Sequence, residues 1–282
     1  MRSKFYLISA FALLLCLNAC SNFDKTLASF HDAKAGYIMV AAHRGAHNGY
    51  PENSLSALKH AIEIGVDMAE TDVKVTKDSV VVLMHDGKID RTTNGTGDPE
   101  SYTLAELQKF RLKMADGTLT DETIPTFEDF LRIAKGKIMV DIDIKTSHLK
   151  PLVDVVKKTN TQSQVVWFDN DYDALLKIRS MEPGAMFMPR AYNYQMADSA
   201  LKVFNPKVVH IDESFYTPEV SNLIRQKNAR IWINALGEAD FLIKNGEIEK
   251  AMDKLLKHQA NVIQTDQPEK MLEYLRSKGL HN

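Results

Sequence analysis

Eight short runs that are apolar or alternate in polarity, each able to form a strand, recur along the chain from residue 38 onward and limit its fold more than any other feature. Helical patterns fit between them, for example at residues 217–227, where Thr217 is a suitable cap. Eight strand–helix units in roughly 240 residues predict an α/β fold, a TIM-type (β/α)8 barrel with a small insertion after the second parallel strand. The runs occupy residues 38–42, 68–75, 137–145, 164–169, 185–190, 208–212, 230–234 and 261–266.

A doubly wound sheet is the competing α/β arrangement, but no glycine-rich phosphate-binding fingerprint follows any of the runs. We therefore expect one barrel domain over residues 37–280. The hydrophobic content of 44% is ample for a buried core. A formal net charge of −2 gives no basic surface for nucleic acid, so a polynucleotide is not an expected partner.

The first 36 residues are expected to lie outside the barrel. Two basic residues precede an apolar stretch, and residues 17–20, Leu-Asn-Ala-Cys, have the form of a lipoprotein cleavage site. This pattern predicts a signal peptide at residues 1–19, lipidation of Cys20 and a polar, lipid-anchored tether at residues 20–36. The alternative is an uncleaved membrane helix, but the apolar run is shorter than the ~20 residues that a span needs. We expect a lipoprotein of the cell envelope, on the periplasmic face or the cell surface.

Reactive side chains gather at and near the ends of the first runs. His43 and Arg44 follow the run at residues 38–42, and His85 follows a further apolar run at residues 80–84. Glu70 and Asp72 alternate within one strand, which places them on the same face with Cα atoms roughly 7 Å apart. Two carboxylates this close favour a cation between them. In a barrel, the carboxyl ends of the strands meet at one mouth, where the site is expected.

These fragments resemble, in order and spacing, the glycerophosphodiester phosphodiesterase family. The family pattern is HRG, PEN[TS], E-x-D, and HD followed by RTTNGTG, and it is matched at residues 43–45, 51–54, 70–72 and 85–97. The resemblance implies the barrel fold and hydrolysis of glycerophosphodiesters to glycerol phosphate and an alcohol. With the leader, it indicates a lipoprotein member of the family from a bacterium.

The resemblance and the residue chemistry together suggest roles for the site. His43 and His85 are expected to act as a general acid and base. Glu70, Asp72 and Asp143 are expected to hold one divalent cation, Ca²⁺ or Mg²⁺, because all the ligands are oxygens. Asp143 stands where the family pattern, E-x-K, has glutamate, so this ligand is shorter by one methylene. The alternative is that the acids only form ion pairs with the neighbouring basic residues.

Three residues are predicted to contact substrate. Arg44 and Lys145 are suited to binding the phosphate, although both could instead pair with the acids. Trp232 could wall the subsite for the alcohol or pack in the core. The remaining histidines, His47 and His210 among them, stand in no such motif and receive no role.

The sequence also allows two alternative functions, and for the expected hydrolysis it leaves two candidate nucleophiles. The membrane anchor suggests lysophospholipase D-like cleavage of lysophospholipids, and a non-catalytic solute-binding lipoprotein on a barrel is a further alternative. No serine, threonine or cysteine stands beside either histidine, so a covalent intermediate on a side chain is not expected. The nucleophile is then water or the glycerol 2-hydroxyl of the substrate. The resemblance implies the hydroxyl, with a cyclic glycerophosphate as intermediate.

Overall fold

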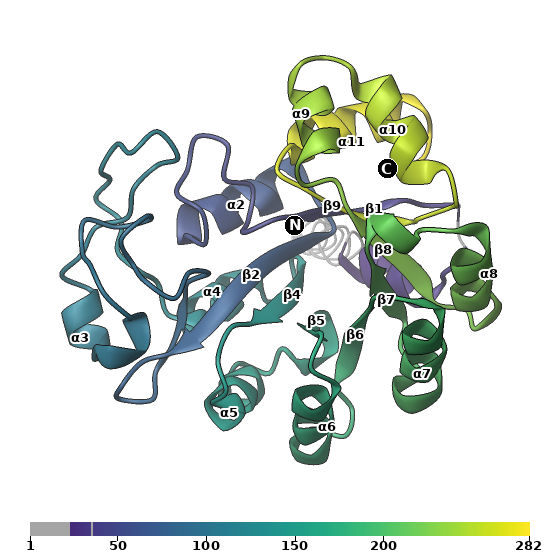
Figure 1. Cartoon of the computed structure of the whole chain (residues 1–282). Coiled ribbons are helices and arrows are strands. Elements are labelled where there is room, and N and C mark those ends of the chain that lie inside the picture. Colours follow the sequence, from purple (N-terminus) through teal and green to yellow (C-terminus); the bar gives the residue numbers. More distant parts are fainter. Residues whose placement is uncertain (1–22, 35) are drawn as a thin grey trace, which may run out of the picture.

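The computed structural model describes residues 23–34 and 36–282, and a closed parallel barrel forms its centre (Figure 1). Hydrogen bonds join eight parallel strands into a ring in the order β1, β2, β4, β5, β6, β7, β8, β9 and back to β1. The predicted (β/α)8 barrel is confirmed. The strands are β1 (Met39–Ala42), β2 (Met68–Val75), β4 (Met139–Ile144), β5 (Val165–Asp169), β6 (Met186–Ala191), β7 (Val208–Ile211), β8 (Arg230–Asn234) and β9 (Val262–Thr265).

Most of the helices cover the outside of the barrel, and capping side chains mark where several of them begin. Ser54 accepts a hydrogen bond from the backbone N–H of Ala57 at the start of α2, and Gly65 ends this helix in the left-handed conformation. Thr217 caps α8 in the same way. The helices are α2 (Leu55–Ile64), α3 (Leu104–Leu107), α4 (Phe127–Ala134), α5 (Leu149–Thr159), α6 (Tyr172–Met181), α7 (Tyr194–Phe204), α8 (Pro218–Gln226), α9 (Glu238–Lys244), α10 (Ile248–Leu256) and α11 (Pro268–Ser277).

The insertion follows β2, as predicted, and it begins with a strand that is not part of the barrel. This strand, β3 (Val81–Leu83), pairs antiparallel to the far end of β2. Residues 84–126 then form a lobe with its own small apolar core before α4 returns to the barrel. His85 therefore reaches the mouth from a hairpin beside the barrel, whereas His43 follows a barrel strand directly.

The amino ends of the strands are closed by a short helix at residues 23–31. Phe30 from this helix is 1% exposed and packs against the first residues of several strands. Arg230, at the start of β8 and fully buried, donates to the backbone carbonyls of Ser29, Phe30 and Asp32. These bonds satisfy carbonyls at the end of the helix that would otherwise be buried without partners.

Of the polar tether predicted at residues 20–36, residues 23–31 form a helix that packs on the barrel. The physical reason is that Phe23, Leu27 and Phe30 recur at helical spacing, and the open end of the barrel offers an apolar surface to cover. Truncation of a buried phenylalanine such as Phe30 to alanine typically costs ~3–5 kcal/mol. The predicted signal peptide and Cys20 lie outside the described residues.

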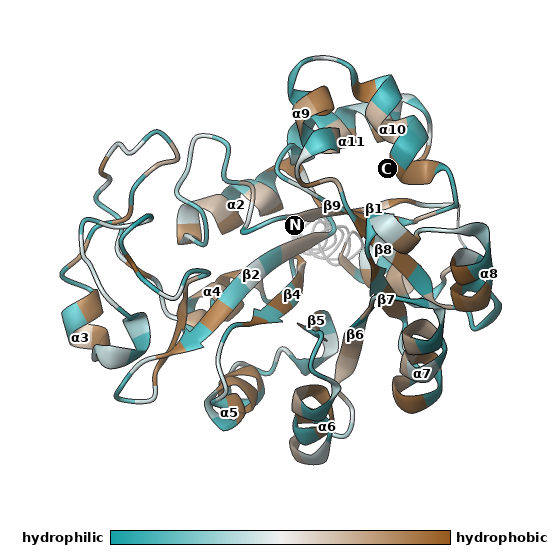
Figure 2. Ribbon diagram, in the orientation of Figure 1, coloured by the Kyte–Doolittle hydropathy of each residue, from teal (hydrophilic) through white to brown (hydrophobic). Residues whose placement is uncertain are grey.

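The strand β2 carries charged residues although every one of its residues is buried. Figure 2 shows hydrophilic and hydrophobic segments along this strand. Two acids and a lysine in one buried strand need compensating partners.

None of the helices in the described part of the chain is both long and apolar enough to cross a bilayer.

Candidate active site

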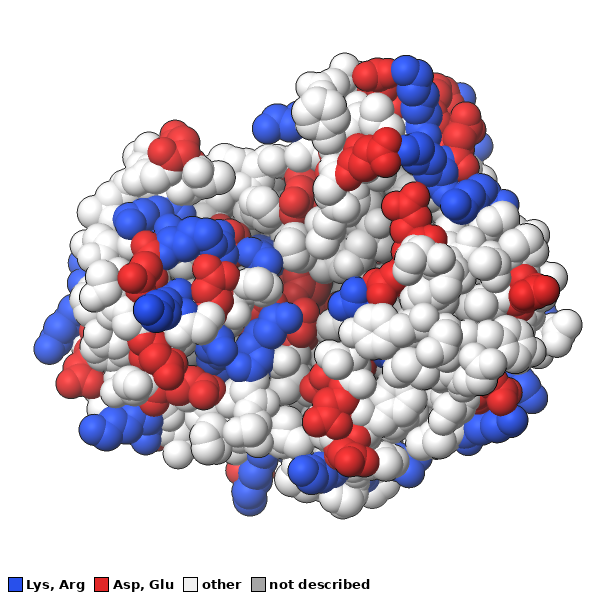
Figure 3. Space-filling view, viewed as in Figure 1, with Lys and Arg blue, Asp and Glu red and all other residues white. Residues whose placement is uncertain are grey.

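A cavity of about 230 Å³ opens at the carboxyl ends of the barrel strands. Figure 3 shows a hollow on this face with acidic side chains inside it. Of the residues predicted to form the site, six line this cavity: His43, Arg44, Glu70, His85, Asp143 and Lys145. Residues separated by about a hundred positions in the sequence thus surround one space of a size suited to a small substrate.

Three carboxylates converge on one side of the cavity. In the parallel pairing of β2 with β4, Asp72 lies directly beside Asp143, and Glu70 lies two residues earlier on the same face of β2. Oxygen atoms of the three side chains lie within 4.8 Å of one another. The shorter side chain of Asp143 therefore still brings its oxygen into the cluster.

The environment of this cluster disfavours negative charge. Burial, with the nearby charges of Asp72 and Asp143, raises the pKa of Glu70 well above its usual range. Burial also raises the pKa of Asp143 to about 6, although Lys145 opposes the shift. Carboxylates held together under such conditions are stabilised by a bound cation.

Residues of the loop between β1 and α2 fix the orientation of these acids. The backbone N–H of Arg44 donates to Glu70 Oε2 at 2.7 Å, and the Asn53 side-chain amide donates to Asp72 Oδ2 at 2.8 Å. Both Arg44 and Asn53 adopt positive φ angles, 53° and 52°. Such backbone conformations are uncommon for residues with side chains, and here they direct the two donors at the acids.

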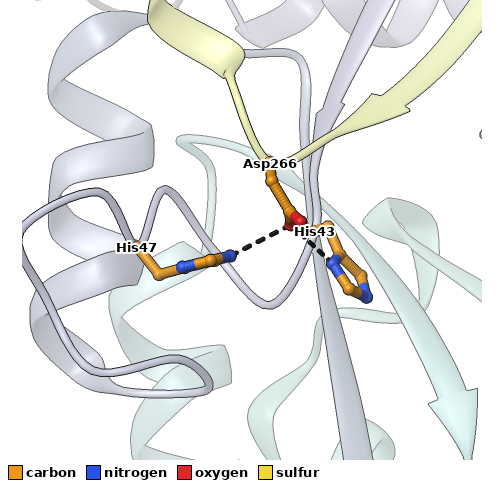
Figure 4. Close-up of side chains that lie close together, drawn as sticks. All are labelled: His43, His47 and Asp266. Carbon is orange, nitrogen blue, oxygen red and sulfur yellow. Dashed lines mark hydrogen bonds and ion pairs between the residues drawn. The ribbon is translucent and has the colours of Figure 1, made fainter. Parts of the chain in front are cut away.

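His43 is held by a carboxylate that the sequence analysis left without a role. His43 Nδ1 lies 2.7 Å from Asp266 Oδ1, and His47 Nε2 lies 3.1 Å from the same oxygen (Figure 4). Burial alone would raise the pKa of Asp266, but the hydrogen bonds from His43 and His47 hold it well below its usual range. An ionised Asp266 keeps the proton of the His43 ring on Nδ1, which leaves Nε2 for a substrate.

His85 is also held by a carboxylate. Its Nδ1 lies 2.7 Å from Asp86 Oδ1. Arg91 donates to both Asp86 and Glu52, with its four bonds between 2.6 and 3.0 Å. Glu52 in turn accepts from Arg44 Nη1 at 2.7 Å. This chain of ion pairs connects the insertion to the loop after β1 and so fixes His85 against the barrel mouth.

The two predicted phosphate-binding residues are paired with acids in this structure. Arg44 Nη1 contacts Glu52, and its Nε lies 3.4 Å from Asp72 Oδ2. Lys145 Nζ lies 2.8 Å from Asp143 Oδ2 and 3.6 Å from Asp72 Oδ1. Ion pairing, the alternative noted for both residues, is thus present. It does not exclude phosphate binding, since both cations also line the cavity.

Trp232 packs in the core and does not line the cavity, so of the two roles open for this residue the structure has the core role. Its side chain is fully buried in the barrel core, and its Nε1–H donates to Asn234 Oδ1 at 3.0 Å. Because side chains alternate along a strand, Asn234 shares the inward face with Trp232 but lies one layer nearer the mouth, where it lines the cavity. The position of Trp232 near the end of a strand could not by itself show whether its side chain lies in the barrel core or in the layer that lines the cavity.

Several residues of the site were missed because single-sequence reasoning supplied no partner for them. Asp266 was expected at the barrel mouth as the end of a strand, but without a partner, and Asp86 and Glu52 stood only within motifs. His47 stood alone in a loop. A cue was available for Asp86 and Glu52, since acids inside motifs that also contain a histidine or arginine commonly orient those groups.

The fold and the site define a (β/α)8-barrel protein whose mouth combines a cluster of three carboxylates with two carboxylate-bound histidines. The model for the Glycerophosphoryl diester phosphodiesterase family matches residues 43–270. This match covers most of the chain and includes every residue of the cluster and both histidines. The protein therefore belongs to the glycerophosphoryl diester phosphodiesterase family.

Individual relatives show the same relationship. A glycerophosphodiester phosphodiesterase from Caldanaerobacter subterraneus is 35% identical over 153 residues, which are 51% of this chain and 63% of that protein. One from Bacillus altitudinis is 37% identical over 114 residues, 38% of this chain and 45% of that protein. Both alignments thus span less than two thirds of the relative. The crystal structure of a glycerophosphoryl diester phosphodiesterase from Parabacteroides distasonis superposes with a TM-score of 0.80 at 27% identity, covering 92% of this chain and 93% of that one.

The two histidine–carboxylate pairs generate a prediction about turnover of glycerophosphodiesters. His43→Ala and His85→Ala should each lower kcat by the ~10²–10⁴-fold typical of general acid–base groups. His148→Ala is the matched control, because His148 is exposed and its side chain makes no hydrogen bond to a described residue. If the roles are split, the pH–rate profile of the wild-type protein should be bell-shaped. Near-native turnover in either variant would remove that histidine from the mechanism.

Proposed function

We propose that the protein hydrolyses glycerophosphodiesters to glycerol phosphate and an alcohol, with a divalent cation. The observation that carries this proposal is the convergence, around one small cavity, of a carboxylate cluster, two cationic side chains and two carboxylate-bound histidines. Family membership supports the same reaction. A solute-binding lipoprotein would have no need of both histidines with their partner acids.

The carboxylate cluster fits a divalent cation. Glu70, Asp72 and Asp143 would hold it through oxygen atoms, which favours Ca²⁺ or Mg²⁺. A bound cation would offset negative charge that develops on the phosphate oxygens. Arg44 and Lys145 would bind the same phosphate, Arg44 through two nitrogens of its guanidinium and Lys145 as a point charge.

The histidines are suited to moving the protons of the reaction. One of His43 and His85 would take a proton from the nucleophile, and the other would give one to the oxygen of the departing alcohol. Asp266 and Asp86 stabilise the imidazolium that forms on each ring and hold the ring orientation. Both histidines line the cavity in which the phosphate would bind.

A metal-removal experiment tests the cation site. Exhaustive chelation should abolish turnover, and Ca²⁺ or Mg²⁺ should restore it. Asp143→Glu, which restores the residue of the family pattern, should retain cation binding by calorimetry, whereas Asp143→Ala should lose most of it because only two carboxylates remain. Full activity of chelated protein, with no metal found by elemental analysis, would contradict the proposed site.

We also propose that the nucleophile is the glycerol 2-hydroxyl of the substrate. This hydroxyl lies next to the phosphoester and can attack it at high effective concentration. A 2-deoxy analogue should then bind normally but react far more slowly, and the normal substrate should give a transient cyclic glycerophosphate in phosphorus NMR spectra. Equal rates for both substrates, with no cyclic species, would make water the nucleophile.

We further propose that the protein is anchored in the cell envelope through a lipid on Cys20, with its active site directed away from the membrane. Three residues from Cys20 to residue 23 can extend at most ~10 Å. The helix at residues 23–31 packs on the closed end of the barrel, opposite the cavity. An anchor at this end favours water-soluble glycerophosphodiesters over the lysophospholipids of the alternative function.

The anchor is tested by labelling with radioactive palmitate in a bacterial host. The full chain should be labelled and should sediment with membranes, because Cys20 is the acylated residue, and Cys20→Ala should lose the label. Cys16→Ala is the matched control and should keep it. Absence of label from the full chain, or equal labelling of the Cys20→Ala variant, would refute the lipid anchor.

A further inference from the structure

The wall of the cavity across from the carboxylate cluster takes no part in the proposed cation binding, phosphate binding or proton transfer. In the ring of eight strands, β7 lies diametrically opposite β2, which carries Glu70 and Asp72. His210 on β7, Arg190 on β6 and Asn234 on β8 line the cavity on this side. A phosphodiester bound near the cluster would direct one of its two organic groups toward this wall.

His210 is buried here with unused hydrogen-bonding capacity. The residue is 2% exposed, and neither ring nitrogen has a hydrogen-bond partner among the residues that the structure describes. Its ring packs between Phe168, with centroids 5.0 Å apart, and Trp232, at 6.3 Å. These neighbours fix the ring without hydrogen bonding to it, because Phe168 has no polar side-chain atom and Trp232 Nε1–H donates to Asn234 Oδ1. Buried polar groups without a partner are rare and commonly mark a place where a ligand or water binds.

The charge state of His210 suits an uncharged partner. Burial, with the nearby charge of Arg190, lowers the pKa of His210 to about 3. The neutral imidazole has one nitrogen that donates and one that accepts. A hydroxyl group matches both, because it too can donate and accept. An ammonium group can only donate.

Arg190 makes the same wall unfavourable for cationic groups. Its Nη2 pairs with Asp212 Oδ1 at 2.5 Å, which leaves its Nε buried without a partner among the described residues. Its guanidinium also lies 5.1 Å from the centre of the Tyr192 ring. One face of the Tyr192 ring is therefore already in contact with a cation, which competes there with a quaternary ammonium.

We propose that His210 binds a hydroxyl of the head-group alcohol and that this wall favours polyol head groups, such as glycerol or inositol, over ethanolamine and choline. This inference rests on the proposed function, and it specifies the substrate class of the same cavity. His210 acts on substrate choice and takes no part in moving the protons of the reaction.

The test compares kcat/KM for glycerophosphoglycerol, glycerophosphoinositol and glycerophosphocholine. The wild-type protein should prefer the two polyol substrates. His210→Phe keeps an aromatic ring between Phe168 and Trp232 but removes both nitrogens. It should lower kcat/KM for the polyol substrates roughly three- to tenfold, the loss of one hydrogen bond, and leave glycerophosphocholine unchanged within about twofold. His210→Gln retains a donor and an acceptor and should recover part of the preference.

Other results would contradict either the role of His210 or the proposed function. An equal fall for all three substrates, in a variant with native thermal stability, would place His210 at the shared glycerol moiety and overturn the inference. Unchanged selectivity in both variants, or a wild-type preference for choline, would overturn it as well. If the cation-loaded wild-type protein cleaves none of the three substrates, the proposed function itself fails.

Discussion

The site depends on the burial of like charges in two adjacent strands. Parallel pairing sets Asp72 beside Asp143 and Glu70 beside Asp141, so four acids share the inward face of β2 and β4. Asp141 is also buried, and burial, with the charges of Asp143 and Asp72, raises its pKa well above the usual range. Such an arrangement is costly unless cations are close. Arg44 and Lys145 supply part of the compensation, and a divalent cation would supply the rest. Burial of these carboxylates thus lowers the stability of the fold locally, and the same carboxylates form the proposed cation site.

The surrounding contacts show how this unfavourable cluster is kept in place. Backbone and side-chain donors from the loop after β1 reach Glu70 and Asp72, and the same loop supplies His43. Through Glu52 and Arg91 the loop is also connected to Asp86 and His85 in the insertion. The proposed metal ligands and the proposed proton-transfer groups are therefore positioned by one network. Displacement of the loop would disturb both functions together.

The two ends of the barrel have opposite chemistry. At the carboxyl end, polar and charged side chains are left partly unpaired around a cavity. At the amino end, the helix at residues 23–31 covers apolar side chains, and Arg230 satisfies the carbonyls of the covering segment. The barrel thus has one end that stabilises the fold and one that carries the chemistry. In the proposed orientation, the membrane anchor is attached to the stable end.

The sequence alone determined the barrel, the insertion after β2 and the residues of the carboxylate cluster. These features depend on local patterns: apolar runs of strand length, caps before helices, and alternation that places Glu70 with Asp72 on one face. The sequence could not determine the hydrogen-bond and ion-pair partners of the site residues. Asp266 approaches His43 from a strand more than two hundred positions away, and Arg91 approaches Glu52 from the insertion. Nor could it tell that Trp232 lies one layer below the cavity while Asn234 reaches it. Depth along a strand and contacts between distant segments depend on how the strands are staggered when the barrel closes, and only the tertiary structure decides that.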